Sequence, residues 1–142
     1  MHERPRRIIS DIVKAILDIQ VRDWEDFGST TLKRPIVAGV ETDTCFYIQN
    51  AAQVQNYVNL DLSIYPPPDL APDLVIESDV TSKTVLNAYE ALEVPEVWIY
   101  SNSALKIYIF ESKAERNCYI EISSSPTFPD LDMVNLIPKL FM

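Results

Sequence analysis

The chain is poor in glycine, histidine and cysteine, and these shortages exclude several kinds of site. Its 142 residues include two glycines, one histidine and two cysteines. The sequence contains no Walker loop, dinucleotide-binding fingerprint, nucleophile elbow or zinc pattern. Cys45 and Cys118 lie far apart in sequence, without the spacing of a metal site or a disulfide framework. We expect two reduced cysteines packed in or near strands, and no catalytic role for His2.

Long apolar runs are also missing. No stretch approaches the roughly 18 apolar residues of a membrane-spanning helix. The first ten residues, MHERPRRIIS, are basic, but no apolar signal core follows them. We therefore expect a cytoplasmic protein without a membrane partner.

Basic residues are outnumbered by acidic ones, 12 to 21, which gives a net charge of −9. This charge repels nucleic acid at long range and argues against a protein that coats DNA. It does not exclude a nuclease, because a metal site itself needs clustered carboxylates. The basic residues near the start of the chain are either a weak local basic signal or solvated charge on a helix. They are Arg4, Arg6, Arg7, Lys14, Lys33 and Arg34.

Apolar periodicity and the ten prolines predict a single α/β domain over residues 1–142. The expected elements are a helix at 6–20, strands at 43–50 and 73–78, a helix at 81–94, a hairpin of strands at 96–100 and 104–110, a strand at 118–122 and a short helix near the end. A helix between two strands is typical of a parallel or mixed sheet. We therefore expect a mixed β-sheet flanked by helices.

The stretch PDLVIESD, residues 72–79, combines an apolar strand with three acids, Asp73, Glu77 and Asp79. A strand rises roughly 3.3 Å per residue, so about 13 Å separates Asp73 from Glu77. Oxygen ligands of a metal ion lie only about 2.0–2.6 Å from it. Asp73 and Glu77 therefore cannot form a metal-binding pair by themselves, and a partner for Glu77 must come from another element.

The neighbouring strand offers such a partner in Asp43, which stands at its entry. Paired strands lie about 4.8 Å apart, so Asp43 and Glu77 would face each other if their strands pair. Lys83 follows at the start of the next helix, within reach on its long stem. Two carboxylates and a lysine suit metal-dependent phosphodiester hydrolysis. The alternative is structural, since aspartate is also common in turns and before helices.

The segment PDLVIESDVTSKTVLNAYEALEVPEVWIY resembles the Uma-type restriction endonuclease family of the PD-(D/E)xK nuclease superfamily. The matching features are a strand ending in glutamate at 72–77, a Ser/Thr-rich link at 81–84, Tyr89 near the end of a helix, and VPEVW at 94–98. The stretches HERPRRIIS, FGSTTLKR, GVETDTCFYIQN and SPTFPDL are similar as well. The resemblance extends over nearly the whole chain.

This resemblance implies a restriction-endonuclease-like fold and a DNA endonuclease that uses Mg²⁺ or Mn²⁺. Its pattern implies Asp43 and Glu77 as the acidic metal ligands. Asp73 is then a structural residue at the strand entrance and a secondary candidate for metal binding. Lys83 is the nearest basic residue and the candidate catalytic lysine.

Two departures from the family pattern raise an alternative function. Relatives carry the lysine about four residues before the tyrosine, a position that Val85 occupies here. Relatives also have an earlier strand hairpin with a further glutamate, which we expect to be absent here. The missing hairpin would leave a sheet edge open and favour a homodimer. The alternative is therefore an inactive nuclease-fold protein that acts as a dimerising or regulatory binding module.

Overall fold

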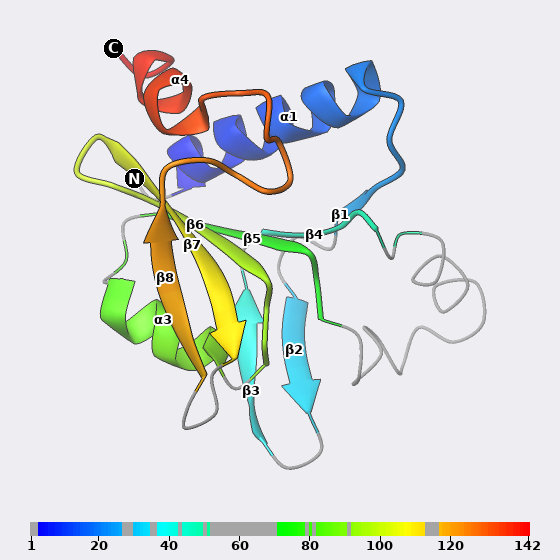
Figure 1. Ribbon diagram of the computed structural model, residues 1–142, viewed down its shortest axis with the longest axis vertical. Coiled ribbons are helices and arrows are strands. Elements are labelled where there is room, and N and C mark those ends of the chain that lie inside the picture. The colour runs from blue at the N-terminus through cyan, green and yellow to red at the C-terminus, as the bar shows by residue number, and fades with distance from the viewer. Residues whose placement is uncertain are drawn as a thin grey trace.

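The computed structural model describes residues 3–26, 30–34, 37–42, 44–49, 51, 71–78, 80, 82–90, 92–112 and 117–142. Within these residues it contains three helices and two β-sheets (Figure 1). The helices are α1 (Glu3–Ile19), α3 (Ser82–Glu90) and α4 (Met133–Lys139). The strands are β1 (Glu25–Asp26), β2 (Thr30–Arg34), β3 (Val37–Thr42), β4 (Cys45–Tyr47), β5 (Leu74–Ser78), β6 (Glu96–Ser101), β7 (Ala104–Ser112) and β8 (Asn117–Ile122).

The main sheet has six strands in the order β1-β4-β5-β6-β7-β8. β5 and β6 pair in parallel and are joined through α3, whereas the other neighbours in this sheet pair antiparallel. β2 and β3 form a separate antiparallel pair. The mixed α/β sheet flanked by helices that the sequence predicts is thus confirmed.

One face of the main sheet is covered by α1 and α4 (Figure 1). α1 buries Ile9, Val13 and Leu17 completely, four residues apart, as an amphipathic helix does when one stripe faces a core. They pack with Leu74 and Ile76 of β5 in one apolar cluster. The predicted amphipathic helix is therefore a core helix, and it covers the centre of the sheet.

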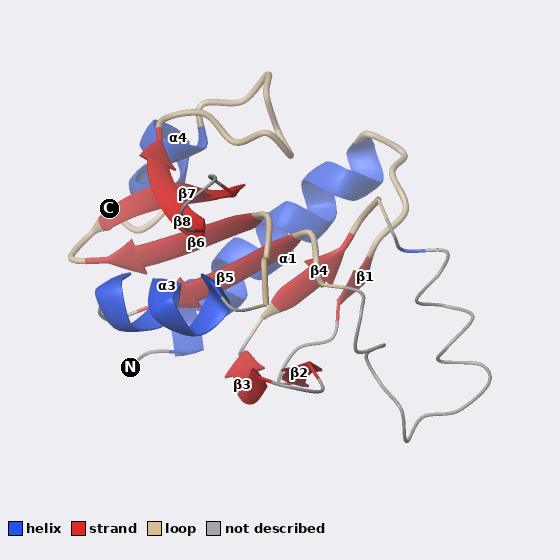
Figure 2. Ribbon diagram, turned by 60° about the horizontal axis from the view of Figure 1, so that its bottom comes forward, coloured by secondary structure: helices blue, strands red, loops and turns tan. Residues whose placement is uncertain are grey.

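The opposite face of the sheet is covered by α3 (Figure 2). Tyr89 of α3 and Leu92 just after it pack in a second cluster, with Cys45 of β4 and Val75 of β5. Because side chains alternate along a strand, β5 sends Leu74 and Ile76 to one cluster and Val75 to the other. All five residues of β5 are buried, so this strand is covered on both faces.

The hairpin of β6 and β7 turns at Asn102 and Ser103, where the sequence places a polar turn. Both residues have positive φ angles, 54° and 63°. Two left-handed residues in succession match the twist of a tight hairpin, and asparagine tolerates this conformation better than most residues. Hydrogen-bonded pairing from Glu96↔Ile109 to Ser101↔Ala104 confirms the antiparallel register.

Other predictions are met less completely. The pairing of β2 with β3 as a second sheet was not predicted from the sequence. Most of the residues between 51 and 71 lie outside the described part of the chain. Cys45 and Cys118 are both free, as expected. Over the part of the chain that the structure describes, no helix has the length and apolar character needed to cross a membrane.

Leu17 and Ile19 lie near the end of α1, one buried and one exposed, and provide a matched test of this packing. Leu17→Ala should lower the free energy of unfolding by about 2–5 kcal/mol, because a fully buried side chain leaves a cavity. Ile19→Ala, at a position that is 81% exposed, should change it by about 0.5 kcal/mol or less. Urea unfolding monitored by circular dichroism measures both values. Equal losses in the two variants would contradict the orientation of α1.

Candidate functional site

Glu77 lies at the carboxyl end of β5, on the face that α3 covers. Only 6% of this residue is exposed. The Tyr89 hydroxyl donates a hydrogen bond of 2.6 Å to Glu77 Oε1. Glu77 is also paired in register with Ile99 of the parallel strand β6. The acid that sequence geometry singles out is therefore a buried carboxyl group with a defined partner from the neighbouring helix.

Tyr89 reaches Glu77 because α3 ends over the sheet and is held there. The Tyr119 hydroxyl of β8 donates to the carbonyl oxygen of Val94 at 2.7 Å and to that of Tyr89 at 3.3 Å. Tyr89 itself is 1% exposed and packs in the α3-side cluster. The last turn of α3 is thus fixed by apolar packing against the sheet and by a hydrogen bond from Tyr119 of the edge strand β8, which lies on the same face.

The phenol of Tyr119 has a perturbed acidity. Burial raises the pKa of Tyr119 well above its ordinary range, and the negative charges of Glu90 and Glu93 raise it further. Each effect disfavours the phenolate, which would be a charge in a poorly hydrated place beside two carboxylates. The hydroxyl therefore stays protonated and keeps its role as a hydrogen-bond donor at alkaline pH.

β4 lies beside β5, as the sequence hypothesis about Glu77 requires. The two strands are antiparallel, with Cys45 opposite Val75. Beyond that pair, the Ile76 amide donates a hydrogen bond of 3.0 Å to the Thr44 carbonyl oxygen. Asp43, the proposed partner of Glu77, lies outside the described residues. Its neighbour Thr44 is nevertheless bonded to the residue that precedes Glu77.

Lys83 and Val85 occupy different surroundings on α3. Lys83 is exposed in the first turn of the helix. Val85 is half-buried and packs against the same cluster as Tyr89, from which it is one helical turn away. The position that shares the site-facing side of the helix with Tyr89 therefore carries an apolar residue, and the nearby lysine reaches into solvent.

Asp73 stands at the opposite end of β5 and has a different role. Its Oδ2 accepts hydrogen bonds from the backbone amides of Ile48, at 2.6 Å, and Gln49, at 3.0 Å. These bonds fix the segment that follows β4. The assignment of Asp73 to the strand entrance is consistent with these contacts, which tie the start of β5 to the end of the neighbouring strand.

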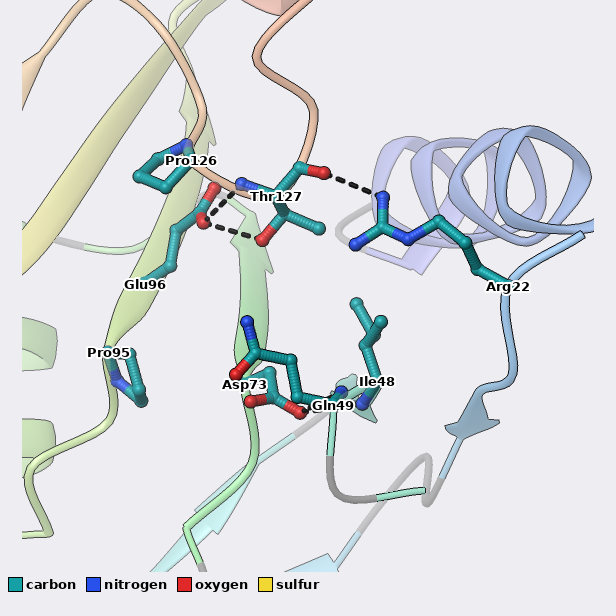
Figure 3. Close-up of a pocket in the computed structure, with 8 residues that line it drawn as sticks. All are labelled: Arg22, Ile48, Gln49, Asp73, Pro95, Glu96, Pro126 and Thr127. Atoms are coloured by element: carbon teal, nitrogen blue, oxygen red, sulfur yellow. Dashed lines mark hydrogen bonds between the residues drawn. The ribbon is translucent and has the colours of Figure 1, made fainter. Parts of the chain in front are cut away.

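A pocket of about 150 Å³ opens beside Asp73 (Figure 3). Arg22 contributes a guanidinium group to its wall and donates a hydrogen bond of 2.7 Å to the Thr127 carbonyl oxygen. The lining residues are Arg22, Ile48, Gln49, Asp73, Pro95, Glu96, Pro126 and Thr127. The pocket thus adjoins the amino ends of β5 and β6, whereas Glu77 is at the carboxyl end of β5.

Glu96 is a second buried acid, which the sequence reasoning did not single out. It is 3% exposed and accepts hydrogen bonds from Trp98 Nε1 at 2.6 Å, Thr127 Oγ1 at 2.7 Å and the Thr127 amide at 3.3 Å, as well as from the Ser125 hydroxyl. These bonds tie the segment before α4 to the start of β6. The motifs PEVW and SPT, which look unrelated in sequence, are therefore two halves of one hydrogen-bonded cluster.

Glu77 suits one ligand position of a divalent metal site. A carboxylate is the hard oxygen donor that Mg²⁺ prefers, and Mg²⁺ is usually held by only one or two protein carboxylates. Over the described residues, no group of three or more His, Cys, Asp or Glu side chains is placed to hold a metal ion. Glu77 would supply one of these carboxylates.

The Glu96 cluster predicts a selective loss of stability. Glu96→Ala should lower the free energy of unfolding by about 1–3 kcal/mol, because it leaves buried donors unpaired. Amide hydrogen exchange at Thr127 and Phe128 should accelerate in this variant. Glu121→Ala, which removes an exposed carboxylate from β8, is the control and should change stability by about 0.5 kcal/mol or less. Unchanged exchange at Thr127 would contradict the anchoring role of Glu96.

Tyr119 predicts a pH dependence of stability. Its pKa is raised in the folded protein, so the unfolded chain loses this proton first as pH rises past about 10. The stabilisation is complete below that pH and declines above it. The stability difference between wild type and Tyr119→Phe, measured by chemical unfolding, should therefore shrink or change sign between about pH 9 and pH 12. A stability difference that stays constant over this pH range would contradict a raised pKa of Tyr119 in the folded protein.

A family model with the description "Uma2: Putative restriction endonuclease" matches residues 2–140. No curated protein matches the chain. The matched range contains Glu77 with its partner Tyr89, and both halves of the Glu96 cluster.

Proposed function

Since the chain belongs to the Uma2 family of restriction endonuclease type, we propose that it hydrolyses phosphodiester bonds of DNA with the help of Mg²⁺ or Mn²⁺. The family supports a nuclease-like function. The observation that carries the more specific proposal is the buried Glu77 at the end of the central strand, with its carboxyl group held by Tyr89. Buried acids with defined partners are enriched at functional sites.

In this proposal Asp43 and Glu77 are the metal ligands. The pairing of β4 with β5 supports it, because the hydrogen bond from Ile76 to Thr44 joins the immediate neighbours of both acids. A bound divalent cation would polarise the scissile phosphate and lower the pKa of an attacking water. Asp73 remains a secondary candidate ligand, although its Oδ2 already binds two backbone amides.

Glu77 and Lys83 would have different roles in the proposed reaction. Glu77 would present its carboxylate from a strand that is covered on both faces, so its position is fixed before any ligand binds. Lys83 would use its exposed, flexible stem to approach the phosphate and neutralise developing charge. A homodimer in the cytoplasm would be the working form.

A second function is favoured by the lysine position. Val85 packs in the apolar cluster where the family pattern has a lysine, and Lys83 is exposed. The net charge of −9 also weakens attraction to DNA. These observations support a catalytically inactive nuclease-fold protein that acts as a dimerising or regulatory binding module.

Cleavage of supercoiled plasmid separates the two functions. The wild-type protein should nick or linearise DNA with Mg²⁺ or Mn²⁺ and stop when EDTA is added. Glu77→Gln and Asp43→Asn should each lower the rate at least about 100-fold, because each removes charge at the metal. Glu121→Gln, which changes an exposed carboxylate of β8, is the matched control, and Asp73→Asn tests the secondary candidate.

Three outcomes would overturn parts of this proposal. Activity that survives in both Glu77→Gln and Asp43→Asn would exclude the proposed site. A large loss in Asp73→Asn with unchanged stability would move the metal toward Asp73. A folded wild-type protein that neither binds Mn²⁺ nor cleaves DNA, and that sediments as a dimer, would establish the binding module instead.

A further inference from the structure

The hydrogen bond between Tyr89 and Glu77 joins two buried side chains. Tyr89 is 1% and Glu77 6% exposed, and the donor and acceptor oxygens lie 2.6 Å apart. A bond of this length is typical of a hydroxyl that donates to a charged carboxylate, which is among the stronger hydrogen bonds in proteins. The bond is therefore a strong local constraint on how the Glu77 carboxyl group can lie.

A glutamate carboxyl group needs such a constraint if it is to bind a metal reproducibly. Rotation about its last torsion is broad, so the two oxygens of an unrestrained glutamate take many orientations. The Tyr89 hydroxyl engages one oxygen, Oε1, and thereby restricts the orientations open to the group. The directions in which Oε2 can point are restricted with it.

Tyr89 is rigid enough to act as this reference point. Its ring is buried in the same apolar cluster as Val75, and half-buried Val85 packs against this cluster. Its backbone carbonyl accepts a hydrogen bond from Tyr119 of β8, and so does the carbonyl of Val94 beyond the helix. Apolar packing and a second tyrosine therefore hold the end of α3 against the sheet.

We propose that Tyr89 is a positioning residue that orients the Glu77 carboxylate for a divalent cation through its hydroxyl group. The inference rests on the proposed function, because it assumes that Glu77 is a metal ligand. Partners that orient a metal ligand typically account for 10–100-fold in metal affinity or activity. Tyr89 would not touch substrate or metal and would act only through Glu77.

Tyr89→Phe tests this role, because it removes one oxygen atom and leaves the ring in the core. Mn²⁺ affinity, measured by isothermal titration calorimetry on the full chain without DNA, should fall 10–100-fold. Plasmid cleavage should fall at low Mn²⁺ and recover toward the wild-type rate at saturating Mn²⁺. Glu77→Gln should not recover, since the ligand itself is changed.

Tyr100→Phe is the matched control. Tyr100 is also buried, but it packs on the α1 and α4 side of the sheet against Phe141. The control should bind Mn²⁺ as the wild type does, whatever its thermal stability. A parallel loss of Mn²⁺ affinity in both variants would show a general effect of core tyrosines and would overturn the specific role of Tyr89.

The other possible results distinguish a failure of the positioning role from a failure of the proposed function. A folded Tyr89→Phe that binds Mn²⁺ within threefold of the wild type overturns the positioning role and leaves the proposed function standing. A wild-type protein that binds no Mn²⁺ overturns both. If Tyr89→Phe does not fold, 4-aminophenylalanine in place of Tyr89 supplies a weaker hydrogen-bond donor. A loss of Mn²⁺ affinity of threefold or more in that variant supports the positioning role. A smaller loss overturns it.

Discussion

β5 is buried on both faces, because α1 packs against one and α3 against the other. Glu77 lies within this strand and is 6% exposed, so its carboxyl group would be costly to leave without a partner. Asp73, just before the strand, is half-buried. Both acids accept hydrogen bonds. Glu77 accepts from the Tyr89 hydroxyl, and Asp73 accepts from the amides of Ile48 and Gln49.

The same constraint gives the two ends of the parallel strand pair different roles. At the amino ends, Asp73 and Glu96 fasten neighbouring segments to β5 and β6 and border a small pocket (Figure 3). At the carboxyl end of β5, Glu77 accepts a hydrogen bond from Tyr89 of α3. Asp73 and Glu96 accept hydrogen bonds mainly from backbone amides and loop side chains, which suits a structural role. Among the described residues, the second end presents the buried Glu77 carboxyl group, which suits a ligand site.

Most of the fold was predictable because its main elements carry strong local signals. The spacing of isoleucine, valine and leucine at three and four residues predicts α1. A short apolar run, a helical segment and a second apolar run predict β5, α3 and β6 in turn. The β2–β3 sheet was missed, because its pairing depends on tertiary context more than on the local pattern. β1 was missed because a strand of two residues has no periodicity to detect.

The sequence by itself determined that Asp73 and Glu77 are separate, since the fixed rise of a strand keeps them apart. It also identified Asp43, Glu77 and Lys83 as the residues to consider, because their types suit a metal and a phosphate. Only the tertiary structure decided that Tyr89 is the partner of Glu77 and that Val85, rather than Lys83, shares its side of α3. These relations depend on how a helix is rotated over a sheet. That rotation is set by the packing of many side chains together, and no local pattern encodes it.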